Sequence, residues 1–415
     1  MANSDSKDRS TEGDILLVDC DSHFTEPPDL WSSRASKSQQ DQMPRMQTED
    51  GMTCWYVNGK VLSSIGGNTF ERDKGKQLGT LTIQPFEDID PACYEVGARL
   101  NVMDKMGVES QILFPNAMGF ASNTMFGIPD IEQRTLIQRI YNDFLVDIQH
   151  ESGNRLFPQA VLPVWDMDHT IQEMTRLREQ GITGFTLSDK PHTVGLPGLD
   201  SEYFAPMWAL ANEMGAVFNF HIGSGFGLTG SDDPVIKEIV RTGNPVSIPN
   251  PDIYWDGLGP QRRLAVLATQ FYMSNARIIV NLCMSNIFDS YPNVKINSAE
   301  SGIGWVPFIL EAMEYQFDEM VTDPGEQKYA KRRPTEYFRD HIYVTYWFEK
   351  SAPERLIDVI GEGNVLVETD IPHPTCIVEN ARDRIAASLA GLDPKVQRRV
   401  LRDNAIELFG LPAPI

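Results

Sequence analysis

The stretch ILLVDCDSH, residues 15–23, places two chemically interesting side chains at the end of an apolar run. Ile15 to Asp19 is typical of a short strand that is buried on both faces. Asp21 and His23 stand two positions apart, so on an extended chain both point to the same side. A carboxylate and an imidazole that converge in this way form half of a metal site. The plain alternative is an aspartate that caps the next turn beside an ordinary histidine, and this pair alone favours neither reading.

Seven further apolar runs repeat this pattern, with helical periodicity between them. Eight strands that alternate with helices and lack hairpin turns predict parallel βα units. Eight is also the number that closes a barrel, so we expect an α/β fold, a (β/α)8 TIM barrel, with an open doubly wound sheet as the rival. After residues 15–19, the strands are expected at 109–114, 156–164, 184–187, 216–221, 294–299, 342–346 and 365–369. The helices are expected at 95–105, 133–150, 168–179, 202–214, 259–274, 306–320, 352–360 and 394–409.

Two long segments interrupt the repeat. Residues from about 32 to 91 form an insertion after the first strand, with a hairpin expected around Val57-Asn58-Gly59-Lys60. Residues 223–260, rich in Gly, Pro, Asn and Asp, follow the fifth strand. Both lie on the face where barrels carry active-site loops, and their length calls for a functional or lid-like role. Residues 15–415, including the insertion at about 32–91, are expected to form a single barrel domain.

Composition excludes several classes of protein. A formal net charge of -22 repels nucleic acids and anionic membrane surfaces. No apolar run reaches the roughly 20 residues that would span a bilayer. The five cysteines are odd in number and form no CxxC pair, which favours a reducing, cytoplasmic location. Residues 1–14 are polar, so we expect a flexible tail rather than a secretory signal.

Two more candidate ligands stand at the ends of predicted strands. His221 ends the fifth strand and Asp370 follows the eighth. Barrel enzymes place catalytic residues at the C-terminal ends of their strands. A buried carboxylate also needs a partner, because burying it alone is costly. A divalent cation would explain these two positions together with Asp21 and His23.

Several short motifs in the sequence occur together in one known family. They are Asp-x-His at 21–23, EPPDLW at 26–31, VFNFH at 217–221, ESGIGWVP at 300–307, TDIPH at 369–373 and the closing helix with Asn404-Ala405 and Leu408-Phe409. By these motifs the chain resembles the amidohydrolase-related family, which includes aminocarboxymuconate-semialdehyde decarboxylase and aromatic-acid decarboxylases. The resemblance implies that Asp21, His23, His221 and Asp370 bind one divalent metal ion, zinc or manganese. It also implies a small-molecule substrate and a homodimer or higher homo-oligomer. Many members have histidine where this chain has Asp21, and the extra carboxylate makes manganese plausible beside zinc.

Glu300 stands where several family members carry a catalytic histidine. It is either a catalytic base or a residue that hydrogen-bonds and orients His221, and both readings stay open. We expect His373 to support Asp370 from outside the metal. Substrate contacts are expected from Trp305 and Trp347, which flank strand ends, and from Arg72 in the insertion. Aromatic residues at such positions are nevertheless more often part of the core.

Two reactions are compatible with this site. In hydrolysis of an amide, lactone or related acyl compound, the metal lowers the pKa of bound water and Asp370 accepts the proton. In non-oxidative decarboxylation of an aromatic or unsaturated carboxylic acid, Asp370 protonates the carbon that loses CO₂. Asp21, Glu300 and Asp370 together outweigh the charge of one divalent cation, which disfavours an anionic substrate. We therefore expect hydrolysis first and decarboxylation as the alternative.

Overall fold

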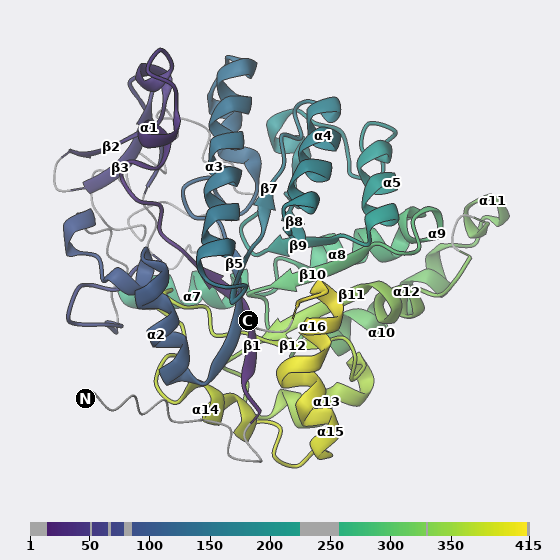
Figure 1. Ribbon diagram of the computed structural model, residues 1–415. Coiled ribbons are helices and arrows are strands. Elements are labelled where there is room, and N and C mark those ends of the chain that lie inside the picture. Colours follow the sequence, from purple (N-terminus) through teal and green to yellow (C-terminus); the bar gives the residue numbers. More distant parts are fainter. Residues whose placement is uncertain are drawn as a thin grey trace.

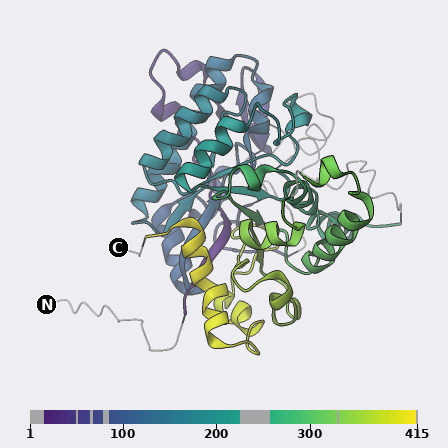
Figure 2. The same cartoon turned by 90° about the vertical axis from the view of Figure 1, so that its right-hand side faces the viewer.

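Parallel strands form the centre of the computed structural model, which describes residues 15–49, 52–64, 68–78, 85–224, 257–328 and 331–412. The strands follow the order β6-β5-β1-β12-β11-β10-β9-β8-β7, and helices lie around them (Figures 1 and 2). All eight predicted strand positions are occupied. The strands are β1 Leu17–His23, β5 Val108–Phe114, β6 Leu156–Pro158, β7 Ala160–Val161, β8 Gly184–Thr186, β9 Val217–His221, β10 Lys295–Ala299, β11 Ile342–Tyr346 and β12 Val365–Val367.

The two ends of this sheet are consecutive in the chain, and this closes the barrel. β6 pairs with β5, β7 pairs with β8, and Gln159 alone separates β6 from β7. The backbone N–H of Gln159 donates to Leu113 O at 2.8 Å, and its side-chain oxygen accepts from Asn219 Nδ2 at 2.8 Å. The strand expected at 156–164 is therefore two short strands, because its pairing partner changes at Gln159. The fold is a TIM barrel, and the open sheet is excluded.

Helices lie where the sequence predicts them, with α3, α4 and α5 side by side in Figure 1. The closing helix is interrupted by a π-helical turn, η7 Arg399–Asp403, between α15 and α16. Asp393 caps it by accepting the N–H of Lys395 at 2.8 Å, and Gly410 ends it in the left-handed region. The expected helices are α2 Val96–Met106, α3 Ile131–Glu151, α4 Met167–Glu179, α5 Ala205–Met214, α7 Pro260–Phe271, α10 Val306–Met320, α13 Ala352–Ile360, α15 Pro394–Arg398 and α16 Asn404–Phe409. Helices that the sequence reading lacked are α1 Leu30–Arg34, α8 Ala276–Met284, α9 Ile287–Ser290, α11 Pro324–Gln327, α12 Pro334–His341 and α14 Ala381–Ala387.

The insertion after β1 contains a small antiparallel sheet of β2 Arg45–Glu49, β3 Met52–Val57 and β4 Lys60–Ser64. Its predicted hairpin is present, and Asn58 and Gly59 have φ angles of 53° and 73°, as a two-residue type I′ turn requires. Buried Trp55 packs edge-to-face on Trp31 with ring centroids 4.7 Å apart, which joins this sheet to the rest of the core.

Two sequence expectations fall largely outside the described residues. The tail expected at 1–14 lies outside them, as does most of the loop expected at 223–260, of which only 223–224 and 257–260 are described. None of the helices in the described ranges is long and apolar enough to cross a membrane.

Candidate metal centre

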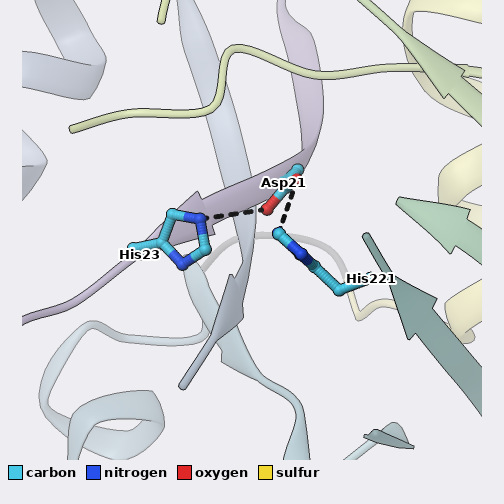
Figure 3. Close-up of side chains that lie close together, drawn as sticks. All are labelled: Asp21, His23 and His221. Carbon is cyan, nitrogen blue, oxygen red and sulfur yellow. Dashed lines mark ion pairs between the residues drawn. The ribbon is translucent and has the colours of Figure 1, made fainter. Parts of the chain in front are cut away.

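Six side chains meet at the ends of four of the five consecutive strands β1, β12, β11, β10 and β9. Asp21 and His23 lie on β1 and His221 ends β9, while Glu300 follows β10 and Asp370 and His373 follow β12. Because the strands are parallel, their C-terminal ends lie at one end of the barrel. Figure 3 shows three of these side chains, Asp21, His23 and His221, pointing toward one another. Five of the six are buried, and the His373 side chain is 25% exposed.

The atoms that face one another are potential metal ligands. Asp21 Oδ2 lies 3.2 Å from His221 Nε2, and Asp21 Oδ1 lies 3.8 Å from His23 Nε2. Asp370 Oδ1 lies 3.5 Å from the same His23 nitrogen. None of these five atoms has a hydrogen-bond partner within the described part of the chain. Buried polar atoms without partners are costly, and a divalent cation between them would supply the missing partner.

The ring of His221 is oriented by its neighbour. His221 Nδ1 donates to the backbone carbonyl of Ile222 at 2.8 Å, which leaves the Nε2 lone pair facing the cluster. Glu300 Oε2 lies 3.5 Å from that same Nε2 atom. Glu300 is therefore on the ligand side of the ring, whereas Ile222 occupies the orienting position.

Glu300 and Asp370 adopt a backbone conformation that is unusual for residues with side chains. Their φ angles are 55° and 61°, in the left-handed region, which costs on the order of 1 kcal/mol or more. Hydrogen bonds hold both turns in place. The N–H of Asp370 donates to Asp21 O at 2.9 Å, and the N–H of Glu300 donates to Glu368 Oε2 at 3.1 Å. These turns fix the positions of the Glu300 and Asp370 carboxylates at the strand ends.

Burial and mutual repulsion shape the protonation of the cluster. Burial, followed by the charges of Asp370 and Glu300, raises the pKa of Asp21 well above its ordinary value. Burial likewise raises the pKa of Asp370, and burial and then Asp370 raise the pKa of Glu300 to about 7. Burial lowers the pKa values of His23 and His221, so both imidazoles are neutral and able to bind metal. A cation that binds here displaces protons from the carboxylates.

The remaining predicted residues lie in different surroundings. His373 Nδ1 lies 3.0 Å from Asp370 Oδ2, on the outer side of that carboxylate. Trp347 is buried against Tyr272, and the indole N–H of Trp305 donates to Ser301 O at 2.8 Å. Arg72 is exposed and donates to Tyr94 Oη and to the carbonyl of Glu87. Within the described residues no contact joins Arg72 to the cluster, and the substrate roles of all three residues stay predictions.

Three residues near the cluster were absent from the sequence prediction. Phe120, in the loop after β5, stacks on His221 with ring centroids 3.8 Å apart. Tyr272 follows α7, and after burial the charges of Glu300 and Asp370 raise the pKa of its phenol. The charge of Lys76, in the insertion, lowers the pKa values of Asp370 and His373. Phe120 and Lys76 lie in loops, which follow no periodic pattern, and Tyr272 lies at the end of a predicted helix whose pattern does not indicate a contact with the site.

The fold is a TIM barrel, and carboxylates and imidazoles cluster at the ends of its strands. These two features together indicate the class of metal-binding barrel enzymes. Residues 18–411 match the family model described as amidohydrolase. The chain therefore belongs to the amidohydrolase family, and it is an enzyme of that family. The resemblance seen in the sequence motifs is confirmed.

Known relatives agree with this assignment. Gamma-resorcylate decarboxylase from Rhizobium radiobacter is 26% identical over 324 residues, which cover 75% of this chain and 86% of the relative. The fold matches an amidohydrolase from Mycobacterium avium subsp. paratuberculosis K-10, with a TM-score of 0.68, 18% identity and coverage of 96% and 99% of the two chains. It also matches a dihydroxybenzoic acid decarboxylase from Polaromonas sp. JS666 that contains manganese and the inhibitor 2-nitroresorcinol. The TM-score there is 0.58, with 18% identity and coverage of 96% and 98%.

Proposed function

We propose that this enzyme is a metal-dependent decarboxylase that releases CO₂ non-oxidatively from an aromatic or unsaturated carboxylic acid. The observation that carries the proposal is the 26% identity to gamma-resorcylate decarboxylase over 75% of the chain. This reverses the order of the two reactions expected from the sequence, in which hydrolysis came first. The sequence argument for hydrolysis compared the charges of three carboxylates with that of one metal ion. It did not include a positively charged side chain near the site.

Lys76 supplies such a cation. Its ammonium donates to Cys376 O at 2.5 Å, in the loop that follows Asp370. The charges of Lys76 and of one divalent ion together match those of Asp21, Glu300 and Asp370. The charge argument against an anionic substrate is therefore weaker than it was from the sequence alone.

Aromatic side chains beside the cluster suit a planar substrate. Phe120 stacks on His221 on one side, and Tyr272 packs edge-to-face on Trp347, with ring centroids 5.2 Å apart. Aromatic rings contribute large apolar surfaces and prefer offset or edge-to-face contacts with other rings. These residues support an aromatic or conjugated acid as the substrate class.

Asp370 would carry the proton of the reaction. A divalent cation held by Asp21, His23, His221 and Asp370 would supply positive charge to substrate oxygen atoms. Burial raises the pKa of Asp370 in the metal-free protein, and its Oδ2 atom, which lies 3.0 Å from His373 Nδ1, is the oxygen that would hold the proton. As the bond between the ring carbon and the carboxylate breaks, CO₂ leaves, and the electron pair that remains on the carbon takes the proton of Asp370. The Asp370 carboxylate then regains a proton from solvent.

Hydrolysis of an amide, lactone or related acyl compound is the second candidate, and Glu300 favours it. Burial and then the Asp370 charge raise the pKa of Glu300 to about 7, and its Oε2 atom lies 3.5 Å from His221 Nε2. A base with a pKa near neutrality is well suited to take a proton from water. Glu300 would be this base.

A substrate panel separates the two reactions. Protein loaded separately with Mn²⁺ and with Zn²⁺ is incubated with hydroxylated benzoic acids and, in parallel, with lactones, anilides and aryl esters. We expect CO₂ release from at least one acid, with one deuterium incorporated at the vacated carbon in D₂O. Turnover of acyl compounds without CO₂ release from any acid would establish hydrolysis instead. The homo-oligomeric state and the cytoplasmic location stay predictions.

A further inference from the structure

The motif EPPDLW at 26–31 contributes no side chain to the metal cluster, and it begins with a buried carboxylate. Glu26 follows β1, and its side chain is inaccessible to solvent. Its Oε1 atom accepts three hydrogen bonds, from the N–H of Asn116 at 3.1 Å, the N–H of Ala117 at 2.9 Å and Tyr141 Oη at 2.9 Å. Asn116 and Ala117 lie in the loop after β5. The carboxylate therefore joins the loops that follow two neighbouring strands of the barrel.

We propose that Glu26 is a positioning residue, which fixes the loop of residues 115–121 and thereby holds Phe120 against His221. The Phe120 ring centroid lies 3.8 Å from that of His221, with an interplanar angle of 27°, and 5.3 Å from that of His23. Phe120 lies on no helix or strand, so the course of the loop decides where its ring lies. The consequence for catalysis rests on the proposed function, in which Phe120 lies against an aromatic substrate.

The chain between the carboxylate and the ring is short and held by further hydrogen bonds. Phe120 comes only four positions after Asn116. The N–H of Gly119 donates to Asn116 O at 2.9 Å, and Gly119 has a φ angle of 70°, which closes a tight turn. Thr124 Oγ1 donates to the carbonyl of buried Met118 at 2.6 Å. A displacement of the loop where it meets the carboxylate is therefore passed on to the ring.

The carboxylate is itself held from the opposite side by the last residue of its own motif. Tyr141, the third donor to Glu26, lies on α3, and its ring stacks on Trp31 with ring centroids 6.1 Å apart. The indole N–H of Trp31 donates to Ile137 O at 2.9 Å, and Trp31 packs edge-to-face on Trp55. Both tryptophans are fully buried. The phenol that binds Glu26 is therefore fixed by the core.

The charge of the carboxylate matters as well as its shape. Hydrogen bonds to an anionic oxygen are about twice as strong as those between neutral groups, and three donors converge on one oxygen here. The other oxygen, Oε2, is buried and has no hydrogen-bond partner among the described residues. A glutamine that kept its oxygen toward the donors would place its amide nitrogen at this position, without an acceptor. Glu26→Gln therefore weakens the attachment of the loop while nearly preserving the side-chain volume.

The first test observes the Phe120 ring directly and needs no substrate. Full-length protein loaded with diamagnetic Zn²⁺ carries 4-fluorophenylalanine at position 120 and is examined by ¹⁹F NMR. We expect one narrow resonance, shifted by the ring current of His221. Glu26→Gln should move and broaden this resonance. Tyr141→Phe removes one of the three hydrogen bonds and keeps the stacked ring, so it should have a smaller effect in the same direction.

Glu109→Gln is the matched control. Glu109 lies at the opposite end of β5, its side chain is 12% exposed, and its carboxylate accepts from Arg402 at 2.6 Å and 2.8 Å. This variant also removes a largely buried, hydrogen-bonded carboxylate, but it does so far from the loop of residues 115–121. The fluorine resonance should remain unchanged in it.

The second test uses an aromatic acid that the substrate panel identifies. Glu26→Gln should raise KM by roughly 2- to 10-fold, the change expected for Phe120→Ala, with kcat and metal content within about 2-fold of wild type. In the Phe120→Ala background, Glu26→Gln should raise KM no further, because the ring that it positions is gone. A residue that only stabilised the fold would leave KM unchanged.

An unchanged fluorine resonance in both Glu26→Gln and Tyr141→Phe would overturn the proposal. Increases in KM that multiply in the double variant would overturn it too, since the two residues would then act independently. If Glu26→Gln does not fold, the resonance of Tyr141→Phe decides alone. Absence of decarboxylation with every acid of the panel would refute the proposed function, whereas the NMR measurement would still test the role of Glu26.

Discussion

At the scale of single residues, Asp370 is assigned two roles, metal ligand and proton donor. Asp370→Asn keeps one ligand oxygen but removes the acid. We expect bound metal to be largely retained while turnover falls by roughly 10²–10⁴-fold, the usual cost of a lost acid–base catalyst. Metal content and kcat measured on the same preparation check this. Asp383→Asn is the matched control, because Asp383 is an exposed partner of Arg382. Wild-type kcat in Asp370→Asn would remove Asp370 as the proton donor.

Phe120 provides a test of the substrate class. Its ring stacks on His221, and Phe126, which lies nearby in the chain, packs against Trp165 instead, with centroids 5.7 Å apart. An aromatic contact contributes about 0.5–1.5 kcal/mol beyond area burial, so Phe120→Ala should raise KM for an aromatic acid by roughly 2- to 10-fold or more. Metal content should not change. Phe126→Ala is the control, and an equal rise of KM in both variants would contradict a specific ring contact at Phe120.

Strand geometry made part of the cluster predictable. Asp21 and His23 alternate on one strand, and His221 ends another, so their convergence follows from periodicity and a parallel sheet. The direction in which the Glu300 and Asp370 side chains point depends on left-handed backbone turns. Hydrogen bonds from other strands hold these turns in place. No local pattern indicates those turns, because the residues are not glycine.

At the scale of elements, a buried polar network ties β1, β5 and α2 together near the cluster. Arg99, on α2, donates to His23 O at 2.7 Å, to Ala92 O at 2.7 Å and to Gln111 Oε1 at 3.2 Å. Gln111 in turn donates to Asp19 Oδ2 at 2.8 Å. Asp19 also accepts the N–H of Thr369 at 2.7 Å, just before Asp370. The ends of β1 and β12, which carry Asp21, His23 and Asp370, are therefore held by one connected set of hydrogen bonds.

Removal of Arg99 should loosen this network. Arg99→Met keeps much of the side-chain volume but leaves buried acceptors unsatisfied, which costs about 1–3 kcal/mol for a single group. We expect the free energy of unfolding to fall by about 3 kcal/mol, measured by urea denaturation. Arg398→Met is the control, since Arg398 is about half exposed and pairs with Asp403, so its loss should cost about 0–1 kcal/mol. Equal stability of the two variants would show that the Arg99 hydrogen bonds contribute little.

The elements themselves were largely predictable, whereas their irregularities were not. Helices such as α10 and α13 have the expected bounds, because an apolar stripe of period 3.6 defines them. The division of one expected strand into β6 and β7 follows from a change of pairing partner. Such a change depends on strands distant in the sequence, so no local pattern reveals it.

At the scale of the whole molecule, the count of eight strands indicated a barrel but did not exclude an open sheet. Closure became visible only from the pairing of β6 and β7 on opposite sides of Gln159. Lys76 likewise lies near the cluster only because of the path that the insertion takes, and its ammonium donates a hydrogen bond to Cys376 O. Approaches of this kind between distant segments depend on tertiary packing, which sequence periodicity does not encode.

The buried carboxylates predict how metal-free protein responds to pH. The ordinary pKa of Glu300 is 4.5, and burial and then the Asp370 charge raise it to about 7 in the folded chain. Between these values the folded chain holds a proton that the unfolded chain has released. Stability is therefore fully present below the unfolded pKa and falls as pH rises through the folded pKa, by about 3 kcal/mol for this group. The raised pKa values of Asp21 and Asp370 act in the same direction.

Metal should reverse this trend. A cation binds the deprotonated carboxylates, so its affinity rises with pH, and at 1,000 times Kd a single site adds about 4 kcal/mol of stability. We expect the Tm of metal-free protein to fall between about pH 5 and about pH 8. With excess Mn²⁺ the Tm should rise over the same range.

Differential scanning calorimetry of wild type and Glu300→Gln measures both trends. The variant should show a shallower fall without metal, because glutamine does not titrate. A Tm of metal-free wild type that rises with pH would show that the clustered carboxylates are stabilised as anions by the protein itself, and the case for a cation between them would be lost.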